Sequence, residues 1–260
     1  MKSVRPKKAL GQHFLTSEDT AARIAATLDP WQDLPVLEVG PGMGVLTKYL
    51  LASHSDLRVV EIDEESIDYL RYNYPALQGR ILAADFLKLD LATVFPEADR
   101  ICIIGNYPYN ISSQIFFHIL EWRDRVTACS GMLQREVAER LAAAPGTKAR
   151  GILSVLLQAW WDISYLFTVP PGVFNPPPKV ESGVIIMTRN TRTSLGCDER
   201  AFRTIVKTTF GMRRKMLRSS LRSLLLPGQS LPDSPLLSMR PEQLSVAQFI
   251  ELTNLLRPQQ

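Results

Sequence analysis

Residues 36–50 read VLEVGPGMGVLTKYL: an apolar run, three glycines at alternate positions, then an apolar-periodic stretch. This order predicts a buried strand, a tight loop and a helix, because glycines let the backbone approach a ligand and a helix N-terminus offers unpaired N–H groups. A dinucleotide-binding loop, G-x-G-x-x-G, would need glycine at position 45, where this chain has Val45. We therefore expect Gly40 and Gly42, with Glu38 two residues before the first glycine, to serve another nucleotide-type ligand.

The alternation of short apolar runs with helical periodicity continues to about residue 187. Helical patterns follow the early strands over 46–52, 64–74 and 112–122. Strands that are buried on both faces and separated by helices predict an α/β fold with a Rossmann-like, doubly wound, mainly parallel seven-stranded sheet. The expected strands are 36–40, 57–63, 81–86, 101–106, 129–134, a segment near YLFTVP (165–170) and 183–188.

The pattern changes in the last third of the chain. TVPPGVFNPPPKVES (168–182) contains too much proline for a helix or a central strand, so we expect a rigid loop there. A polar connector then leads to two helical stretches, over 198–225 and over 240–256, the second with Pro at its start. We predict a sheet domain over 1–190 and a small all-helical domain over 191–260.

The composition is that of a globular chain with one core plus a small appendage: 260 residues, 45% hydrophobic and 22% charged. Every apolar run is far shorter than the roughly 20 residues that cross a bilayer, and the N-terminus lacks the apolar core of a signal peptide. Three cysteines without a C-x-x-C pair, and three histidines, fit neither a disulfide framework nor a metal site. We expect a cytoplasmic protein without metal or membrane partner, and nothing demands more than a monomer.

The net charge is only +4, yet positive charge gathers in two stretches. One is the N-terminal arm, which includes Lys7 and Lys8, and the other lies between Ala201 and Arg222, where no acidic residue occurs. Such clusters predict a polyanionic partner, since each neutralised phosphate releases condensed counterions. A solvated helix face is the alternative, but it would normally intersperse carboxylates. The second cluster comprises Arg203, Lys207, Arg213, Arg214, Lys215, Arg218 and Arg222.

Two carboxylates end the second and third expected strands. Glu61 lies about 20 residues after the glycine loop, the offset of a carboxylate that binds ribose hydroxyls. Asp85 can accept a hydrogen bond from an adenine amino group, and Phe86 can flank the ring. A glycine turn alone is often structural, but three such features at the carboxyl edge of consecutive strands predict a nucleotide-type cofactor. The E-x-G-x-G-x-G order resembles the first motif of S-adenosylmethionine-dependent methyltransferases, which favours this methyl donor over NAD.

The fourth strand ends in IIGNYPYN (103–110), beside the expected donor site. The amine of adenine N6 is planar and a poor nucleophile, so two neutral acceptors on its hydrogens would direct its lone pair toward the methyl group. The Asn106 oxygen can be one acceptor, and the carbonyl of Tyr107, which Pro108 restricts to extended geometry, can be the other. Tyr109 can stack on the base. A proline turn with two packed tyrosines is the alternative, but the element resembles the N/D-P-P-Y motif of base amino-methyltransferases.

Six motifs, in order and spanning nearly the whole chain, resemble the KsgA-type small-subunit rRNA adenine dimethyltransferases: GQHFL (11–15), EVGPGMG, VEID, GNYPYN, FNPPPKVES (174–182) and FGMRRKMLRSSL (210–221). These enzymes convert two adjacent adenosines near the 3′ end of 16S rRNA to N6,N6-dimethyladenosine, a step of ribosome biogenesis. The resemblance implies a methyltransferase domain over 1–190, with its basic arm, and an rRNA-binding helical domain over 191–260. It also implies methyl-donor contacts by His13, Leu15, Gly40, Glu61, Asp85 and Asn106, beside the Gly42 of the glycine loop.

The same resemblance implies two sets of contacts with rRNA. Phe174 would stack on the target adenine opposite Tyr109. The basic element of the helical domain would hold phosphates, which fixes register rather than sequence. Its residues are Arg213, Arg214, Lys215 and Arg218. Because N6 must be reached, the target would be an unpaired or extruded base, which suits a stem-loop. The sequence leaves open whether the basic arm is ordered before RNA or cofactor binds.

The chain departs from the family pattern at two positions. His13 stands where the family often has Asn, and we expect no acid–base role for it. Tyr107 stands where the family commonly has the Leu of NLPYN, and we expect its side chain to pack or to line the pocket.

Two other functions remain open from the sequence. An Erm-type large-subunit rRNA methyltransferase would share the glycine loop and the Asn-aromatic-Pro-Tyr element. A ribosome-assembly factor with secondary catalysis would share the basic surface, although the cofactor residues and Asn106 favour retained chemistry.

Overall fold

The computed structural model describes residues 4–7, 10–225 and 228–256, and its chain divides into two compact units. Unit 1 comprises Met1–Ala138 and Ile163–Arg189, and unit 2 comprises Glu139–Asp162 and Asn190–Gln260. The predicted boundary near 190 lies at one of the junctions between the units. The division differs from the prediction at residues 139–162, which the sequence assigned to the sheet domain.

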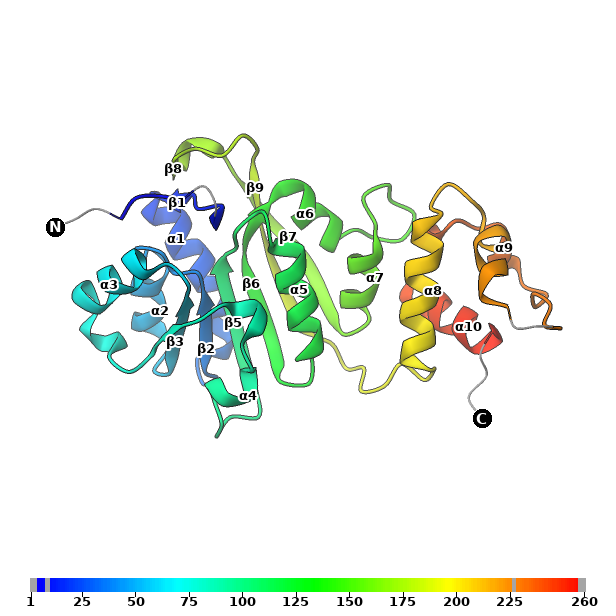
Figure 1. Ribbon diagram of the computed structural model, residues 1–260, viewed down its shortest axis with the longest axis horizontal. Helices are drawn as coiled ribbons and strands as arrows, with labels where there is room; N and C mark the ends of the chain where they lie inside the picture. Colours follow the sequence, from blue (N-terminus) through cyan, green and yellow to red (C-terminus); the bar gives the residue numbers. More distant parts are fainter. Residues whose placement is uncertain (1–3, 8–9, 226–227, 257–260) are drawn as a thin grey trace. The chain divides into compact units, whose positions relative to one another are not determined.

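The strands all belong to two sheets (Figure 1). The larger sheet has seven strands in the order β4-β3-β2-β5-β6-β9-β7, and the smaller pairs β1 with β8. The bounds are β1 (Phe14–Leu15), β2 (Val36–Val39), β3 (Leu57–Glu61), β4 (Ile81–Ala83), β5 (Ile101–Asn106), β6 (Val126–Gln134), β7 (Trp161–Val169), β8 (Phe174–Asn175) and β9 (Ser182–Arg189).

The helices occur between the strands and in unit 2. The α-helices are α1 (Glu18–Ala25), α2 (Thr47–Ser53), α3 (Glu64–Asn73), α4 (Leu91–Val94), α5 (Ser112–Glu121), α6 (Arg135–Leu141), α7 (Ile152–Gln158), α8 (Glu199–Gly211), α9 (Leu217–Ser220) and α10 (Val246–Leu256). Short 3₁₀ turns are η2 (Ala26–Trp31), η3 (Pro75–Leu77), η4 (Phe86–Lys88), η5 (Pro171–Val173), η6 (Leu221–Leu224), η7 (Pro235–Ser238) and η8 (Pro241–Gln243).

The seven-stranded sheet confirms the predicted fold class. The pairs β3–β4, β2–β3, β2–β5 and β5–β6 are parallel, while β9 runs antiparallel to β6. All seven strands that the apolar runs predict are present, with β6 and β7 each longer than expected. Parallel neighbours place their carboxyl ends at one edge of the sheet, where open α/β sheets bind ligands.

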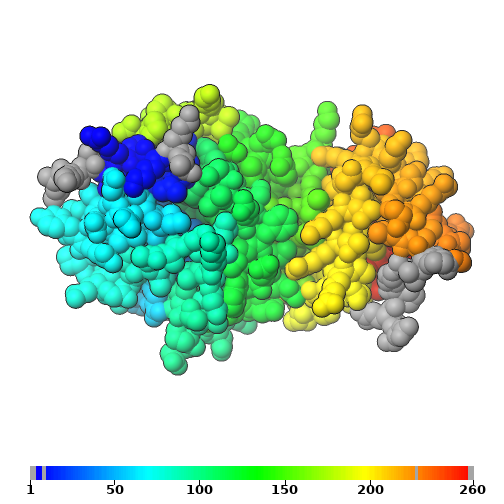
Figure 2. Space-filling model, viewed as in Figure 1, coloured from blue at the N-terminus to red at the C-terminus, as the bar shows by residue number. Residues whose placement is uncertain are grey.

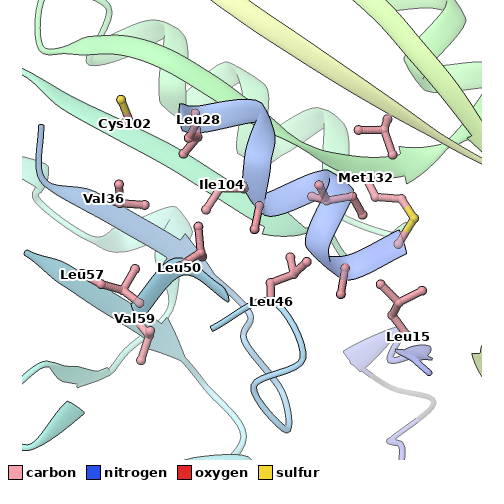
Figure 3. Close-up of a cluster of buried hydrophobic side chains, with 14 of the residues drawn as sticks. Leu15, Leu28, Val36, Leu46, Leu50, Leu57, Val59, Cys102, Ile104 and Met132 are labelled. Atoms are coloured by element: carbon pink, nitrogen blue, oxygen red, sulfur yellow. The ribbon is translucent and has the colours of Figure 1, made fainter. Parts of the chain in front are cut away.

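The core of unit 1 lies between the sheet and the helices that follow its first strands. Alternate strand residues point to one face, so Val36 of β2, Val59 of β3 and Ile104 of β5 form one apolar surface. Leu50 of α2 packs against this surface (Figure 3). Ile24 of α1 belongs to the same cluster, and all five side chains are buried. α5 lies on the opposite face (Figure 1), which makes the sheet doubly wound, as predicted.

The proline-rich segment 168–182 is more ordered than the predicted loop. η5 and β8 lie within it, and β8 pairs with β1, with Phe14 opposite Asn175 and Leu15 opposite Phe174. The sequence prediction missed this pairing because two-residue strands have no periodicity to detect. The small sheet connects the GQHFL motif to the FNPPPKVES motif.

The helices of unit 2 are shorter than predicted. α8 ends at Gly211, a poor helix former, and the stretch expected to continue to residue 225 contains only α9 and η6 after a five-residue loop, 212–216. α10 begins at Val246 and not at the proline, because Ser245 and Gln248 form a reciprocal capping box. The Ser245 N–H donates to Gln248 Oε1 at 2.9 Å, and the Gln248 N–H donates to Ser245 Oγ at 3.2 Å.

A buried arginine links the two sequence segments of unit 2. Arg150 is 0% exposed, and its guanidinium donates to the carbonyls of Ala143 at 2.6 Å and Leu244 at 3.2 Å and to Gln158 Oε1 at 2.6 Å. α7 also packs against α8. Residues 139–162 therefore group with the C-terminal helices, because Arg150 and α7 find polar and apolar partners in the C-terminal segment.

In the described ranges, no helix has the length and apolar character needed to cross a membrane. The same ranges contain no group of three His, Cys, Asp or Glu side chains placed to hold a metal ion. Cys102, Cys129 and Cys197 are free thiols and are buried.

Candidate active site

The ends of three neighbouring strands bring the predicted site residues together. Val39, the last residue of β2, is in register with Gly105 of β5 and with the residue before Glu61 in β3. Gly40, Glu61 and Asn106 therefore lie next to one another at the carboxyl edge. This is the arrangement that the strand-end pattern in the sequence predicts.

A cavity of about 310 Å³ opens at this edge. Gly40, Glu61 and Asp85 line it from the strand ends, residues 106–111 form a second wall, and residues 10–14 form a third. The cavity is large enough for part of a nucleotide-type cofactor and lies at the lower end of the range for such pockets.

The carboxylate of Glu61 is held by backbone donors. Its Oε1 accepts hydrogen bonds from the N–H groups of Ile62 at 2.9 Å and Asp63 at 3.0 Å, and its Oε2 accepts from the Gly42 N–H at 3.1 Å. Burial raises the pKa of the Glu61 carboxyl above its usual value, against the effect of these bonds. Gly42 does not line the cavity, and its N–H group holds the Glu61 carboxylate.

Gly40 provides the close approach that the glycine loop predicts. Its φ is +66°, in the region that favours glycine, and a Cβ built on it would meet no atom within 4 Å. Because Gly40 lines the cavity, that open space belongs to the cavity. A side chain here would both strain the backbone and project into the cavity.

Asp85 and Phe86 follow β4 and line the cavity from the next strand end. Asp85 Oδ1 accepts from the Leu87 N–H at 3.0 Å, which orients the carboxylate while leaving it about one third exposed. The ring of Phe86 is buried and meets the His118 ring edge-on, with centroids 5.2 Å apart. Asp85 can therefore accept a hydrogen bond from a ligand. Phe86 forms the wall of the cavity beside it.

The amide of Asn106 has one determined orientation. Its Nδ2 donates to the backbone carbonyl of His13 at 3.1 Å, and a carbonyl can only accept, so the opposite atom of the amide is the oxygen. Within the described residues no hydrogen bond occupies Oδ1, and Asn106 lines the cavity. The site thus offers a neutral acceptor to an incoming amine.

The Tyr107 side chain packs in the interior, as expected for this departure from the family pattern. It is 1% exposed, and its hydroxyl donates to the Ser130 carbonyl at 2.8 Å. Its ring meets the Phe116 ring edge-on at 5.4 Å. Gly131, with φ +140°, makes room for it, because a Cβ there would lie 2.7 Å from the Tyr107 ring and 2.1 Å from the Gly105 carbonyl oxygen.

Tyr109 and His13 form a stacked pair at the cavity. The ring centroids are 5.5 Å apart and the rings are inclined by 29°. The Tyr109 hydroxyl forms a hydrogen bond with Ser182 Oγ, and His13 Nδ1 lies 2.8 Å from the Pro176 carbonyl oxygen. The aromatic surface predicted to stack on a base is present and is fixed at its hydroxyl.

Leu15 and Phe174 do not line the cavity with the other predicted residues. Leu15 is 4% exposed and Phe174 is 5% exposed, and both side chains belong to the apolar core. Their backbones pair across the small sheet. The stacking of Phe174 on the target base stays a prediction, since its ring is buried in this structure, and the backbone pairing of Leu15 anchors the segment that contains His13.

The cavity wall also contains residues that were not predicted as site residues, Leu10, Gln12 and Ile62 among them. Ile62 is 54% exposed, an unusual position for an isoleucine, and offers an apolar surface next to Glu61. An apolar residue immediately after a strand-end carboxylate is the signal that could have identified it. Leu10 and Gln12 reach the cavity only through the tertiary course of the N-terminal segment.

The basic residues predicted to bind rRNA differ in their local contacts within unit 2. Arg213 donates to the Lys148 carbonyl, and its Nε lies 3.8 Å from the Glu242 carboxylate. Arg218 donates to the Ser238 hydroxyl. Arg214 and Lys215 are exposed, in the loop between α8 and α9. The side chains of Arg213 and Arg218 therefore have protein partners, whereas those of Arg214 and Lys215 face solvent.

The sheet order, the glycine loop and the carboxylates at the strand ends define a class I methyltransferase. A family model described as ribosomal RNA adenine dimethylase matches residues 4–257, and the chain belongs to that family. Members of the family are methyltransferases whose methyl donor is S-adenosylmethionine.

Three known proteins show the extent of the similarity. A ribosomal RNA small subunit methyltransferase A from Parabacteroides distasonis is 62% identical over 97% of this chain and 94% of its own length. A dimethyladenosine transferase from Plasmodium falciparum has the same fold, with TM-score 0.74 at 22% identity over 92% of this chain and 96% of its own. The 23S rRNA methyltransferase ErmE gives TM-score 0.69 at 25% identity over 93% of this chain and 99% of its own.

Proposed function

We propose that this enzyme transfers methyl groups from S-adenosylmethionine to N6 of two adjacent adenosines in a 3′-terminal stem-loop of 16S rRNA. The product is N6,N6-dimethyladenosine in the small ribosomal subunit, and the reaction belongs to ribosome biogenesis. The observation that carries the proposal is the fixed amide of Asn106, which directs a neutral acceptor into a cavity lined by methyl-donor residues. The name of the relative that is 62% identical supports the choice of the small subunit.

The residues of the cavity fit the methyl donor. Open space lies over the Gly40 backbone, and the Glu61 carboxylate is buried and oriented by three N–H groups. Such a carboxylate suits ribose hydroxyls, and Asp85 suits the adenine amino group. When bound, the donor supplies an activated methyl group, so the protein needs no strong base.

The chain's own groups prepare the target amine. Asn106 Oδ1 accepts one N6 hydrogen and the Tyr107 carbonyl accepts the other, which directs the nitrogen lone pair toward the donor. The Tyr109 ring stacks on the base, a contact worth about 1–3 kcal/mol per base. A monomethylated N6 still has one hydrogen for these acceptors, which allows a second transfer.

Unit 2 supplies contacts to the rRNA backbone. We assign phosphate binding to Arg214 and Lys215, because both are exposed and no hydrogen bond or ion pair among the described residues engages their side chains. The contacts of Arg213 and Arg218 assign these two residues to holding the loop and its neighbours in place. The ribosomal substrate also assigns the enzyme to the cytoplasm.

Two other functions predict different outcomes. The structural similarity to ErmE suggests a large-subunit methyltransferase as one alternative. Such an enzyme would label undermethylated large subunits. An assembly factor with secondary catalysis would support normal subunit assembly when its chemistry is removed by Asn106→Ala but not when the whole chain is deleted.

The deciding experiment is methyl transfer from labelled S-adenosylmethionine to undermethylated small subunits, with products read by nucleoside mass spectrometry. We expect dimethyladenosine from the wild type and a rate lower by about 10²–10³-fold for Asn106→Ala, the usual cost of removing one positioned transition-state contact. Asn73→Ala is the matched control, because Asn73 also donates to a backbone carbonyl, that of Tyr69 at 2.8 Å, but lies outside the cavity. Transfer to large subunits instead of small ones would refute the proposed substrate.

A further inference from the structure

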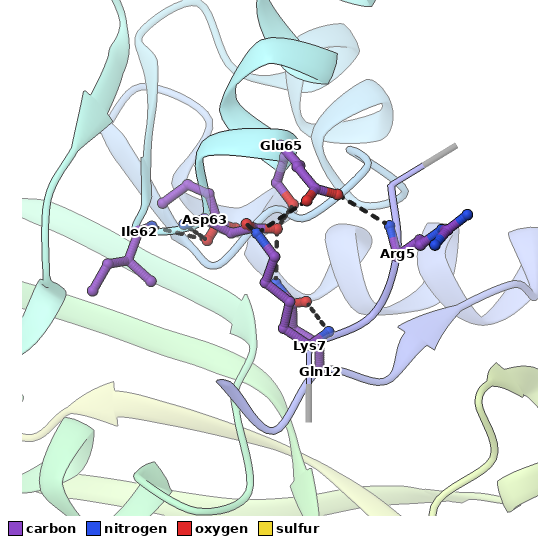
Figure 4. A network of polar contacts seen from close by, with 8 residues as sticks. Arg5, Lys7, Gln12, Ile62, Asp63 and Glu65 are labelled. Atoms are coloured by element: carbon purple, nitrogen blue, oxygen red, sulfur yellow. Dashed lines mark hydrogen bonds and ion pairs between the residues drawn. The ribbon is translucent and has the colours of Figure 1, made fainter. Parts of the chain in front are cut away.

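The carboxylate of Asp63 is the centre of a polar network two residues beyond Glu61 (Figure 4). Its side chain is 0% exposed, and it accepts hydrogen bonds from Ser66 Oγ at 2.9 Å, Gln12 Nε2 at 3.3 Å and the Lys7 ammonium. A buried carboxylate needs such donors, because an unpaired charge in the interior is strongly unfavourable. Two of the three donors come from the N-terminal segment, more than 50 residues away in sequence.

Lys7 and Gln12 are also bound to each other. The Lys7 N–H donates to Gln12 Oε1 at 2.8 Å, and the Lys7 carbonyl accepts from the N–H groups of Leu10 at 3.0 Å and Gln12 at 3.4 Å. The Lys7 ammonium also lies 3.4 Å from the Glu65 carboxylate. The two side chains thus reach Asp63 together from the N-terminal segment, and Figure 2 shows the dark blue N-terminal segment against the cyan β3–α3 region.

Gln12 itself belongs to the wall of the cavity. Residues 10–14 line the cavity, and the His13 carbonyl accepts the hydrogen bond that orients Asn106. The segment is fixed at its far end by the pairing of β1 with β8. At its near end, in the described part of the chain, the bonds to Asp63 and Glu65 fix it to the β3–α3 connection.

We propose that Lys7 and Gln12 are positioning residues of the methyltransferase, joined to Asp63 in a latch that holds residues 10–14 against the methyl-donor cavity. The latch acts on both halves of the reaction. It shapes the wall beside Glu61, whose Oε1 accepts from the Asp63 N–H, and it sets the carbonyl that fixes Asn106. The inference rests on the proposed donor site, and it adds a connection between the basic arm and catalysis.

The electrostatics favour a latch that is closed in the ligand-free protein. Burial alone would raise the pKa of Asp63, but the hydrogen bonds from Lys7, Ser66 and Gln12 outweigh it and hold that pKa below its usual value. Asp63 also raises the pKa of Lys7, chiefly through their hydrogen bond. Both groups are therefore charged at neutral pH.

The test compares Lys7→Met, Gln12→Leu and Lys7→Arg in the full chain. We expect Lys7→Met to weaken binding of S-adenosylhomocysteine by about tenfold, the cost of losing a hydrogen bond to a charged group, and Gln12→Leu to weaken it by less. Lys7→Arg keeps the charge and should restore most of the affinity. Arg5→Met is the matched control for donor binding, because only the backbone N–H of Arg5 has a partner among the described residues, Glu65 at 3.5 Å.

Two further readouts separate positioning from a general loss of stability. Amide hydrogen exchange over residues 10–14 should become faster in Lys7→Met, and by more than the lost donor to the buried Asp63 speeds exchange over the core strands β2 and β5. With undermethylated subunits, kcat should fall while KM for the subunit remains the same. Wild-type donor affinity and wild-type exchange in Lys7→Met would overturn the latch. A wild type that binds S-adenosylhomocysteine but does not methylate small subunits would refute the proposed substrate and leave the latch standing.

Discussion

Replacing the buried Glu38 by Gln should remove a large part of the pH dependence of stability. Glu38 lies on the core-facing side of β2, is 1% exposed, and its Oε2 accepts a hydrogen bond from Thr47 Oγ1 at 2.7 Å. Burial raises the pKa of Glu38 from 4.5 to about 8, with the Thr47 bond opposing this shift and the nearby Glu61 charge adding to it. The folded protein therefore holds a proton on Glu38 at pH values where the unfolded chain has lost it.

The sign and size of the effect follow from this difference in pKa. A raised carboxyl pKa contributes stability that is fully present below pH 4.5 and is lost as the pH rises toward 8. Where the folded protein holds this proton and the unfolded chain does not, each pH unit lowers the free energy of unfolding by about 1.4 kcal/mol. Between pH 5.5 and 8 the free energy of unfolding of the wild type should fall, through this one group, by on the order of 3 kcal/mol.

Urea unfolding at pH 5.5 and pH 8, followed by far-UV circular dichroism, measures the prediction. Glu38→Gln keeps an acceptor for the Thr47 hydroxyl and has no proton to lose, so its stability should fall by on the order of 3 kcal/mol less over the same interval. Other titrating groups are common to both proteins and cancel in the comparison. Equal pH dependence in the two proteins would show that Glu38 is ionised in the fold and that this reasoning is wrong.

Two further predictions concern the basic loop and the sheet. Charge reversal at Arg214 and Lys215 should weaken binding of the rRNA stem-loop and reduce the slope of log affinity against log salt by about 0.7–0.9 per lost phosphate contact, whereas Arg213→Ala should chiefly lower the melting temperature; an unchanged slope would remove the loop from the interface. Gly131→Ala should destabilise the protein by more than about 3 kcal/mol in urea unfolding, because its Cβ would lie 2.1 Å from the Gly105 carbonyl oxygen at φ +140°. A wild-type unfolding midpoint would show that β5 and β6 can move apart at no cost.

The sheet and its strand-end residues could be predicted because their signals are local. An apolar run followed by Glu61 or by Asn106 marks both a strand and the edge where it ends. The register of parallel strands then brings such residues together without further information. Ile62 was missed because an isoleucine at the end of an apolar strand is expected to be buried, whereas its side chain is exposed in the structure.

Other features depend on contacts that the local pattern does not contain. Gln12 reaches the site only because Lys7 and Asp63 fix the course of the N-terminal segment. Phe174 belongs to a recognisable motif, but its neighbours across the small sheet direct its ring into the core. Gly211 itself indicates that the helix ends there, but the helical periodicity on both sides of it predicted one continuous helix.

Arg150 has a consequence for how the chain can be divided and synthesised. Its guanidinium, in the first segment of unit 2, binds the Leu244 carbonyl in the second, so neither segment completes the unit alone. A fragment beginning at Asn190 would expose carbonyls and apolar helix surfaces that residues 139–162 normally cover. On the ribosome, the first segment emerges about a hundred residues before its partner, and a shortened chain that ends before Leu244 would leave a buried arginine without one of its three acceptors. Premature termination in the last helices should therefore mark the product for proteolysis, which makes the C-terminus a quality check on the whole enzyme.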